Sequence, residues 1–239
     1  MVPKKILFCP GIGANGDMFL PIMEELENLS VKFTPIFLDF PRPVSKSESL
    51  AEYTRRAFSD HKFKNKKFDM VVGCSFGGML LQEALKQEII GNTKTVLICT
   101  AHSGRDINSL FYRFSPLFYL LPGFMYRPLQ ILIAILYPLF RMKESWAGKF
   151  ARMFLKTDPS VFFIAPIMIC SWNTGEDFSP QLSEKTIQFH GTSDPLISYK
   201  KLSGRRVPEF PMYKKNHIIF ATDYKFIARE IKTFLSKKY

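Results

Sequence analysis

Hydrophobic and polar positions along the chain follow two alternating patterns. Short runs rich in β-branched and aromatic residues are separated by stretches in which apolar residues recur every three or four positions. The first pattern is typical of strands and the second of amphipathic helices. Strands are expected at residues 6–9, 33–38, 68–73, 94–100, 186–190 and, as a less regular run, 207–213. Helices are expected at residues 17–29, 49–61, 76–87, 198–202 and 223–236.

This order of elements predicts an α/β fold. Strands that alternate with helices indicate a mostly parallel sheet, here of about six strands, with helices on both faces. A length of 239 residues fits one such domain, and a hydrophobic content of 46% excludes a disordered chain.

The strand pattern stops between about residues 103 and 177. The first half of this stretch is strongly apolar, but arginines and prolines interrupt it, and its longest uncharged part, residues 128–140, is too short to span a membrane, which takes about 20 residues. We expect a core of residues 1–102 and 178–239 and an inserted cap of short helices over residues 103–177. Three roles stay open for the apolar faces of these helices: lining a substrate tunnel, resting on a membrane, or packing on the core.

One serine stands in a distinctive turn between a strand and a helix. The segment Gly73-Cys74-Ser75-Phe76-Gly77 follows the apolar run 68–73 and precedes the helical pattern 76–87. A serine in a strained turn leaves no space for side chains two positions before and after it, which explains the glycines. The pattern G-x-S-x-G is weak alone, but between a strand and a helix it predicts a nucleophile elbow. A glycine-rich turn without chemistry is the alternative.

A serine hydroxyl becomes a nucleophile only with a base and an orienting carboxylate. His217 follows the last strand and Asp194 follows the fifth, so both belong to the sheet edge that carries Ser75, where parallel α/β sheets place their ligand sites. Asp194 has an alternative role as a turn or helix-capping residue beside Pro195. Among the other histidines, His61 is expected to be exposed and His190 to be structural. His102 is expected to have a structural role or to contact the substrate in the pocket.

The oxyanion of an acyl-transfer reaction needs two hydrogen-bond donors. We expect one to be the backbone N–H of Phe76 and the other that of Ile12, in a loop where three glycines allow backbone amides to face a ligand. A phosphate-binding loop is the competing interpretation, but the lysine followed by serine or threonine is absent.

The segments PGIGANGDMF, VVGCSFGGM, HGTSDPLIS and NHIIF together resemble the α/β-hydrolase superfamily, and in particular its esterase- or lipase-like serine hydrolases with a helical cap. The resemblance implies that Ser75 attacks an acyl carbonyl, that His217 takes and returns the proton, and that Asp194 orients His217. It also implies that Ile12 and Phe76 bind the oxyanion. We expect no cofactor and no metal ion.

The chain departs from the pattern of this family in three ways. Cys9-Pro10-Gly11 stands where members often have a His-Gly pair, and Asn216 replaces a common glycine before the histidine. The first strand corresponds to the third strand of the family, which leaves a six-stranded sheet.

The function expected from these residues is hydrolysis of a carboxylic ester, or of a thioester, with an apolar acyl group. The apolar insertion, in a chain with 24 phenylalanines, points to the apolar substrate. Two alternatives stay open: a non-catalytic ligand-binding protein of the same fold, and another reaction of the same three residues, such as carbon–carbon bond hydrolysis or acyl transfer.

A net charge of +12 raises the question of an anionic partner. Scattered lysine pairs are typical of solvated surface, which we prefer, and no basic stripe with interleaved aromatics predicts nucleic-acid binding. Peripheral contact with an anionic membrane stays a hypothesis for the cap. Four cysteines without metal-ligand spacing, and a beginning that is typical of a strand and not of a signal peptide, favour a cytoplasmic location.

Overall fold

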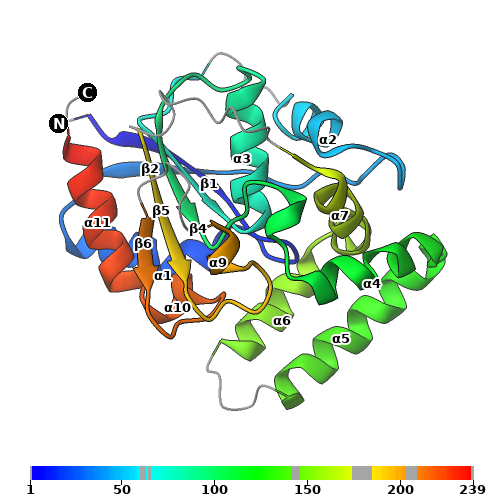
Figure 1. Cartoon of the computed structure of the whole chain (residues 1–239). Helices are drawn as coiled ribbons and strands as arrows, with labels where there is room; N and C mark the ends of the chain where they lie inside the picture. The colour runs from blue at the N-terminus through cyan, green and yellow to red at the C-terminus, as the bar shows by residue number, and fades with distance from the viewer. Residues whose placement is uncertain are drawn as a thin grey trace.

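A parallel sheet forms the centre of the molecule (Figure 1). The computed structural model describes residues 2–59, 63, 66–140, 146–173, 185–202 and 209–237. Six strands in these ranges pair in the order β2-β1-β3-β4-β5-β6, and every pair is parallel. Their bounds are β1 Lys4–Cys9, β2 Phe33–Phe37, β3 Met70–Cys74, β4 Lys94–Ile98, β5 Thr186–Gly191 and β6 Glu209–Met212. The predicted α/β fold with a six-stranded sheet is confirmed.

Helices cover both faces of the sheet because its strands are apolar on both faces. Helices α1 (Leu20–Asn28) and α11 (Tyr224–Ser236) pack on one face, and α2 (Leu50–Ala57) and α3 (Phe76–Lys86) on the other (Figure 1). Successive side chains of a strand point to opposite faces. In β1, Ile6 and Phe8 therefore join the core under α1, while Leu7 and Cys9 join the core under α3.

Local signals explain most helix ends. The α2 helix begins after Ser49, whose hydroxyl accepts from the backbone N–H of Glu52 while the Glu52 carboxylate accepts from that of Ser49. It ends at Ala57, before the predicted residue 61, because Phe58 leaves the helix and packs its ring against Phe63. The expected helix 17–29 is divided into a 3-10 turn, η1 (Gly16–Phe19), and α1, whose first turn contains a proline. Short helices α9 (Tyr199–Leu202) and α10 (Ile219–Thr222) follow β5 and β6.

The described part of the segment between β4 and β5 contains helices and no strand. It comprises η2 (Gly104–Asp106), α4 (Ser109–Leu120), η3 (Gly123–Met125), α5 (Tyr126–Phe140), α6 (Ala147–Lys156) and α7 (Pro159–Ser171). The α7 helix packs against α4 and α5, and α5 packs against α6. The prolines are expected to divide this stretch into short pieces, but α4 continues through Pro116. The packing of α4 on α7 offsets the backbone hydrogen bond that a proline inside a helix removes.

The two ends of this insertion lie side by side. Ser103 forms an antiparallel bridge with Asn173, and the backbone N–H of Gly104 donates to the carbonyl of Trp172 over 2.8 Å. The indole N–H of Trp172 donates to Glu83 of α3 over 2.9 Å, which attaches the returning end to the core. The expected second boundary, residue 177, lies outside the described residues.

No single helix in the described part of the chain is long and apolar enough to cross a membrane. Two bent pairs of neighbouring helices reach that length and composition together, Phe114–Leu120 with Gly123–Tyr137 and Ala147–Lys156 with Pro159–Ser171.

Substitution of Gly77 should destabilise the fold because α3 crosses the end of β1 there without room for a side chain. A β-carbon on Gly77 would collide with the backbone carbonyl oxygens of Cys9 and Pro10, whereas one on Gly91 would meet no atom within 4 Å. We expect Gly77→Ala to lower the free energy of unfolding by at least about 2 kcal/mol, and the control Gly91→Ala to change it by less than about 1 kcal/mol. Urea unfolding measures both, and equal effects would contradict this account of the turn.

Candidate active site

Ser75 lies at the sharp turn between β3 and α3 in a backbone conformation that side chains rarely adopt. Its φ is 50° and its ψ is −118°. The backbone N–H of Ser75 donates to the carbonyl of Ile98 over 2.9 Å, and the hydroxyl of Thr100 donates to the carbonyl of Ser75 over 2.7 Å. Two groups at the end of β4 therefore hold the serine from both sides. The sequence analysis missed Thr100, whose only signal is its place at the end of the neighbouring strand.

The glycines around Ser75 are required by close backbone approach. A β-carbon on Gly73 would lie 2.6 Å from the Cα atom of Gly78, and one on Gly78 would lie 2.7 Å from the side chain of Thr100. Together with Gly77, which faces the end of β1, these contacts confirm the steric explanation of the glycine pattern.

The structure brings together the three residues predicted to act in catalysis. His217 Nε2 lies 3.0 Å from Ser75 Oγ, and His217 Nδ1 lies 2.6 Å from Asp194 Oδ2. The Asp194 side chain is fully buried, and 17% of the His217 side chain is exposed. Asp194 follows β5, and His217 lies between β6 and α10, so all three come from loops at one edge of the sheet.

Hydrogen bonds hold Asp194 in its ionised form. Its Oδ1 accepts from the backbone N–H groups of Leu196 (2.8 Å) and Ile197 (3.1 Å), while Oδ2 faces His217. Burial by itself would raise the pKa of Asp194, but His217 and these two backbone donors outweigh it, and the pKa is lowered from its ordinary value. Asp194 therefore has both roles considered for it: its Oδ1 caps the turn at Leu196 and Ile197, and its Oδ2 contacts His217.

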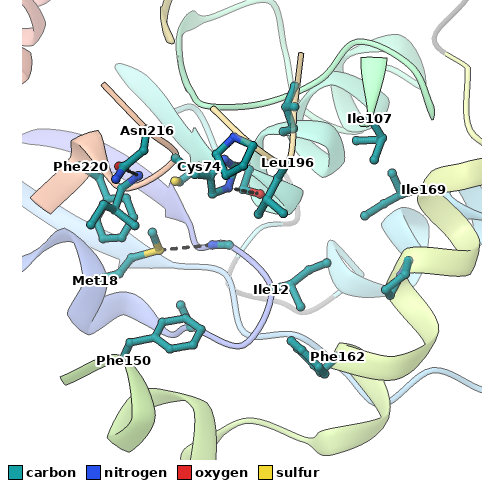
Figure 2. Close-up of a pocket in the computed structure, with 18 of the residues that line it drawn as sticks. Ile12, Met18, Cys74, Ile107, Phe150, Phe162, Ile169, Leu196, Asn216 and Phe220 are labelled. Atoms are coloured by element: carbon teal, nitrogen blue, oxygen red, sulfur yellow. Dashed lines mark hydrogen bonds between the residues drawn. The ribbon is translucent and has the colours of Figure 1, made fainter. Parts of the chain in front are cut away.

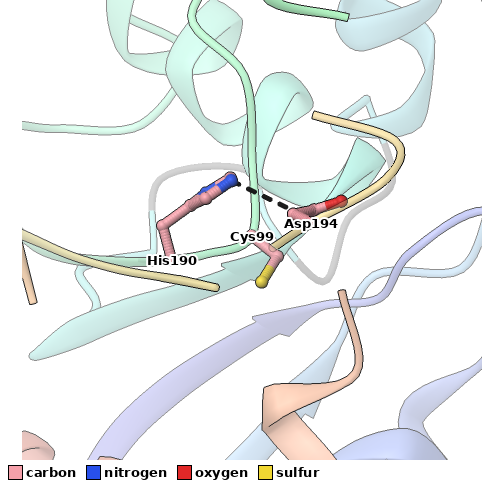
Figure 3. A group of neighbouring side chains, drawn as sticks. All are labelled: Cys99, His190 and Asp194. Carbon is pink, nitrogen blue, oxygen red and sulfur yellow. Dashed lines mark ion pairs between the residues drawn. The ribbon is translucent and has the colours of Figure 1, made fainter. Parts of the chain in front are cut away.

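His190 contacts the same carboxylate (Figure 3). Its Nε2 lies 3.2 Å from the carbonyl of Ile197 and 3.4 Å from Asp194 Oδ2. Burial lowers the pKa of His190, so the ring is neutral at neutral pH, and Nε2 carries the proton if it donates to that carbonyl. Its Nδ1 is buried and finds no partner among the described residues. The structural role expected for His190 fits this geometry, but its contact with Asp194 was missed.

Cys99 completes a group of three potential metal ligands with His190 and Asp194 (Figure 3). Their ligand atoms lie within 4.8 Å of one another. Burial and the neighbouring Asp194 raise the pKa of the Cys99 thiol well above its ordinary value, so a neutral thiol lies beside the carboxylate. Because His217 already uses Asp194, we assign this group to the support of the carboxylate and not to a metal ion.

His102 is enclosed in the core and does not line the cavity described below. Its Nδ1 lies 2.6 Å from the side-chain oxygen of Gln82, and its Nε2 lies 2.8 Å from that of Gln188. The amide nitrogen of Gln82 donates to the carbonyl of Ala101. This network joins α3, β5 and the residues after β4, in accord with a structural role. His61 lies outside the described residues.

Ser75 and His217 face an apolar cavity of about 490 Å³. Figure 2 shows Ile12, Phe150 and Phe162 around it, with Met18 on the side of η1. Its lining contains no lysine, arginine, aspartate or glutamate among the described residues, and its residues with a hydroxyl, amide or imidazole group are few: Ser75, Tyr137, Ser193, Asn216 and His217. The cap contributes Phe118, Tyr137, Trp146, Phe150, Met153, Phe162, Pro166 and Ile169.

The expected oxyanion-binding residues lie beside the serine. Gly11 and Ile12 line the cavity with Ser75, and Phe76 is the buried first residue of α3. The backbone N–H of Gly11 lies 3.2 Å from Met18 Sδ, a contact drawn in Figure 2, so the sulfur helps to hold this loop. The roles of the Ile12 and Phe76 backbone groups remain predictions.

Comparison with known proteins identifies the fold. Neither the protein-family models nor the curated protein sequences gave a match. Among solved structures, a hydrolase from Oleispira antarctica is similar at 16% identity and a TM-score of 0.68, with 100% of this chain and 93% of that chain covered. A thermophilic esterase from Thermogutta terrifontis has 16% identity and a TM-score of 0.66 (98% and 90% covered). An enol-lactonase from Burkholderia xenovorans has 14% identity and a TM-score of 0.69 (99% and 93% covered). The chain therefore has the α/β-hydrolase fold.

The neutral state of His190 predicts a pH dependence of stability. Because its pKa is lowered in the folded protein, the unfolded chain takes up a proton below about pH 6.5 that the folded chain does not, and stability falls as the pH falls. The contribution is at most about 1.4 kcal/mol per pH unit. We expect the free energy of unfolding of the wild type to fall more between pH 7.5 and pH 5 than that of His190→Gln. Parallel curves for the two proteins would contradict the prediction.

Proposed function

We propose that the chain is a serine hydrolase that cleaves a carboxylic ester of an apolar acyl group through an acyl-enzyme on Ser75. The observation that carries the proposal is the line of contacts from Ser75 Oγ to His217 (3.0 Å) and from His217 to Asp194 (2.6 Å) at the wall of an apolar cavity.

The geometry supports a two-step reaction. His217 Nε2 is within reach of the Ser75 proton, so it acts as the general base when Oγ attacks the acyl carbonyl. Asp194 fixes the ring with Nδ1–H toward its carboxylate and stabilises the imidazolium that forms. The imidazolium then gives its proton to the leaving alcohol, and water, activated by the same histidine, hydrolyses the acyl-enzyme.

The negative oxygen of the intermediate would be bound by backbone N–H groups of Ile12 and Phe76. Phe76 begins α3, and free N–H groups at a helix start favour an anion. Gly11 and Ile12 line the cavity together with Ser75, and a β-carbon on Gly11 would lie 3.5 Å from that of Ser75. Because the expected donors are main-chain groups, the Cys9-Pro10-Gly11 variation in this loop does not remove them.

The substrate is inferred from the cavity lining. An apolar wall with no lysine, arginine, aspartate or glutamate among its described residues favours an uncharged acyl chain, since a charged one would lose its hydration without a partner. A thioester meets the same requirements. A non-catalytic ligand-binding role and other reactions of the same residues are the alternatives, because similar folds host many chemistries. The thiols of the described structure are free, which fits the cytoplasmic location we propose.

A fluorophosphonate probe tests the nucleophile. We expect it to label the wild type and not Ser75→Ala, because only an activated serine attacks the probe at a useful rate. Ser193→Ala is the matched control, since Ser193 lines the same cavity and should not be needed. Asp194→Asn should slow the hydrolysis of a soluble ester on the order of 10⁴-fold. Labelling of both the wild type and Ser75→Ala, or of neither, would refute the proposal.

A series of aryl esters from acetyl to lauroyl tests the acyl group. Each methylene buried in the cavity contributes about 0.8 kcal/mol, so kcat/KM should rise by up to roughly fourfold per methylene until the cavity is filled. Phe162→Ala, which enlarges the cavity, should shift the optimum to longer chains. Phe226→Ala on α11, away from the cavity, should leave the optimum in place. Highest kcat/KM for the acetyl ester would argue against an apolar acyl substrate.

A further inference from the structure

The outer side of the cap exposes a run of large apolar side chains. We call it the cap apolar surface, formed by Phe114, Leu117, Leu120, Phe124, Ile131, Leu132, Ile135 and Leu136. The two residues where α4 meets η3 and α5 are the most exposed of these, Leu120 at 74% and Phe124 at 80%. In Figure 1, α4 and α5 lie at the right-hand edge of the molecule, away from α11. Clusters of exposed apolar side chains of this kind mark interaction sites.

The exposed apolar side chains of this surface lie on two helices, α4 and α5, and on the turn between them. On α5, Tyr126, Gln130 and Ala134 are buried, whereas Ile131 and Ile135 are exposed on the other side. A helix that is apolar on both its inner and outer sides is expected to be covered on both. On α4, Phe114, Leu117 and Leu120 recur every three residues; the chain then bends by 107°, Phe124 lies in η3, and Ile131 and Ile135 lie on α5.

Basic residues predominate in and beside the helices that carry this surface. Residues 107–143 contain four basic residues and no acidic one. The neighbouring helix α6 packs against α5 and exposes Lys149, Arg152 and Lys156 at helical spacing. Lys156 faces Asp17 at 3.6 Å, and Arg127 of α5 is exposed and bonds to the carbonyl of Leu155. Exposed basic side chains thus lie on α5, which carries part of the apolar surface, and on α6, which packs against α5.

We propose that the cap apolar surface docks on an anionic lipid bilayer. Apolar side chains that enter the boundary between headgroups and acyl chains, with lysines and arginines beside them, are the combination that anionic membranes bind. A second copy of the chain fits less well, because a symmetric contact would bring the basic borders of two chains together, each with a net charge of +12.

Docking would place the cavity beside a source of apolar esters. Helices α4 and α5, which carry the surface, also contribute Phe118 and Tyr137 to the cavity lining, next to residues of α6 and α7. This consequence rests on the proposed hydrolase function, whereas binding to the bilayer depends on the surface alone. Binding is therefore measured with Ser75→Ala as well as with the wild type.

Vesicle flotation tests the proposal. Wild type and Ser75→Ala should float with vesicles of equal parts phosphatidylcholine and phosphatidylglycerol, and bind pure phosphatidylcholine at least about tenfold more weakly. Raising the salt concentration should weaken binding to the anionic vesicles. The double variant Leu120→Ser with Phe124→Ser should reduce binding at least about tenfold. The matched control is Val2→Ser with Tyr213→Ser, two exposed apolar residues outside the cap.

A second pair of variants tests the charge. Lys149→Gln with Arg152→Gln on α6 should weaken binding to anionic vesicles about tenfold. Lys225→Gln with Arg229→Gln removes the same charge from exposed positions on α11 and should change binding by less than about twofold. Equal losses from the two pairs would show that net charge alone drives binding and would overturn the proposal for this surface.

Further outcomes of these measurements would overturn the proposal for the surface or the proposed function. Failure of the wild type to float with anionic vesicles, or equal binding to both vesicle types, overturns the proposal, even if the cap variants fail to fold. A wild-type dimer that becomes monomeric in Leu120→Ser with Phe124→Ser, without vesicle binding, assigns the surface to a second copy. Vesicle binding without hydrolysis of any soluble ester overturns the proposed function alone, and hydrolysis without vesicle binding overturns the surface alone.

Discussion

The backbone of Ser75 is the constraint on which the arrangement of this molecule depends. A φ of 50° at a residue with a side chain costs on the order of 1 to 3 kcal/mol, and it persists only where the surroundings hold it. The carbonyl of Ile98 and the hydroxyl of Thr100 bind the two sides of the residue. The glycines let β1, β3 and α3 approach closely enough to keep the turn. As a result the hydroxyl stands clear of the strand and faces the cavity.

A buried carboxylate imposes the second constraint. The side chain of Asp194 is fully buried, and it stays ionised because His217 and two backbone N–H groups face its oxygens. His190 contacts the same carboxylate as a neutral ring, with Nε2 3.4 Å from Oδ2. The geometry of the imidazole next to Ser75 is therefore supported by the loop after β5 and by the core beneath it.

The cap has two apolar sides, and they serve different purposes in our interpretation. Its inner side lines an apolar cavity next to Ser75, which in the proposed function selects the acyl group. Its outer side carries exposed apolar residues with basic ones beside them. A cap that only packed on the core would need the first side and not the second. In this interpretation the inner side packs on the core and lines the cavity, and the outer side is the one proposed to rest on a membrane.

The sequence by itself determined the order of strands and helices, the elbow at Ser75 and the choice of Asp194 and His217. Each rests on a local pattern, or on the rule that parallel strands end at one edge of the sheet. Only the tertiary structure decided the contacts of Thr100 with Ser75 and of His190 with Asp194, the enclosure of His102 between two glutamines, and the sides of the cap helices. These depend on segments far apart in the chain that meet in space, and no local pattern of residues specifies which of them will meet.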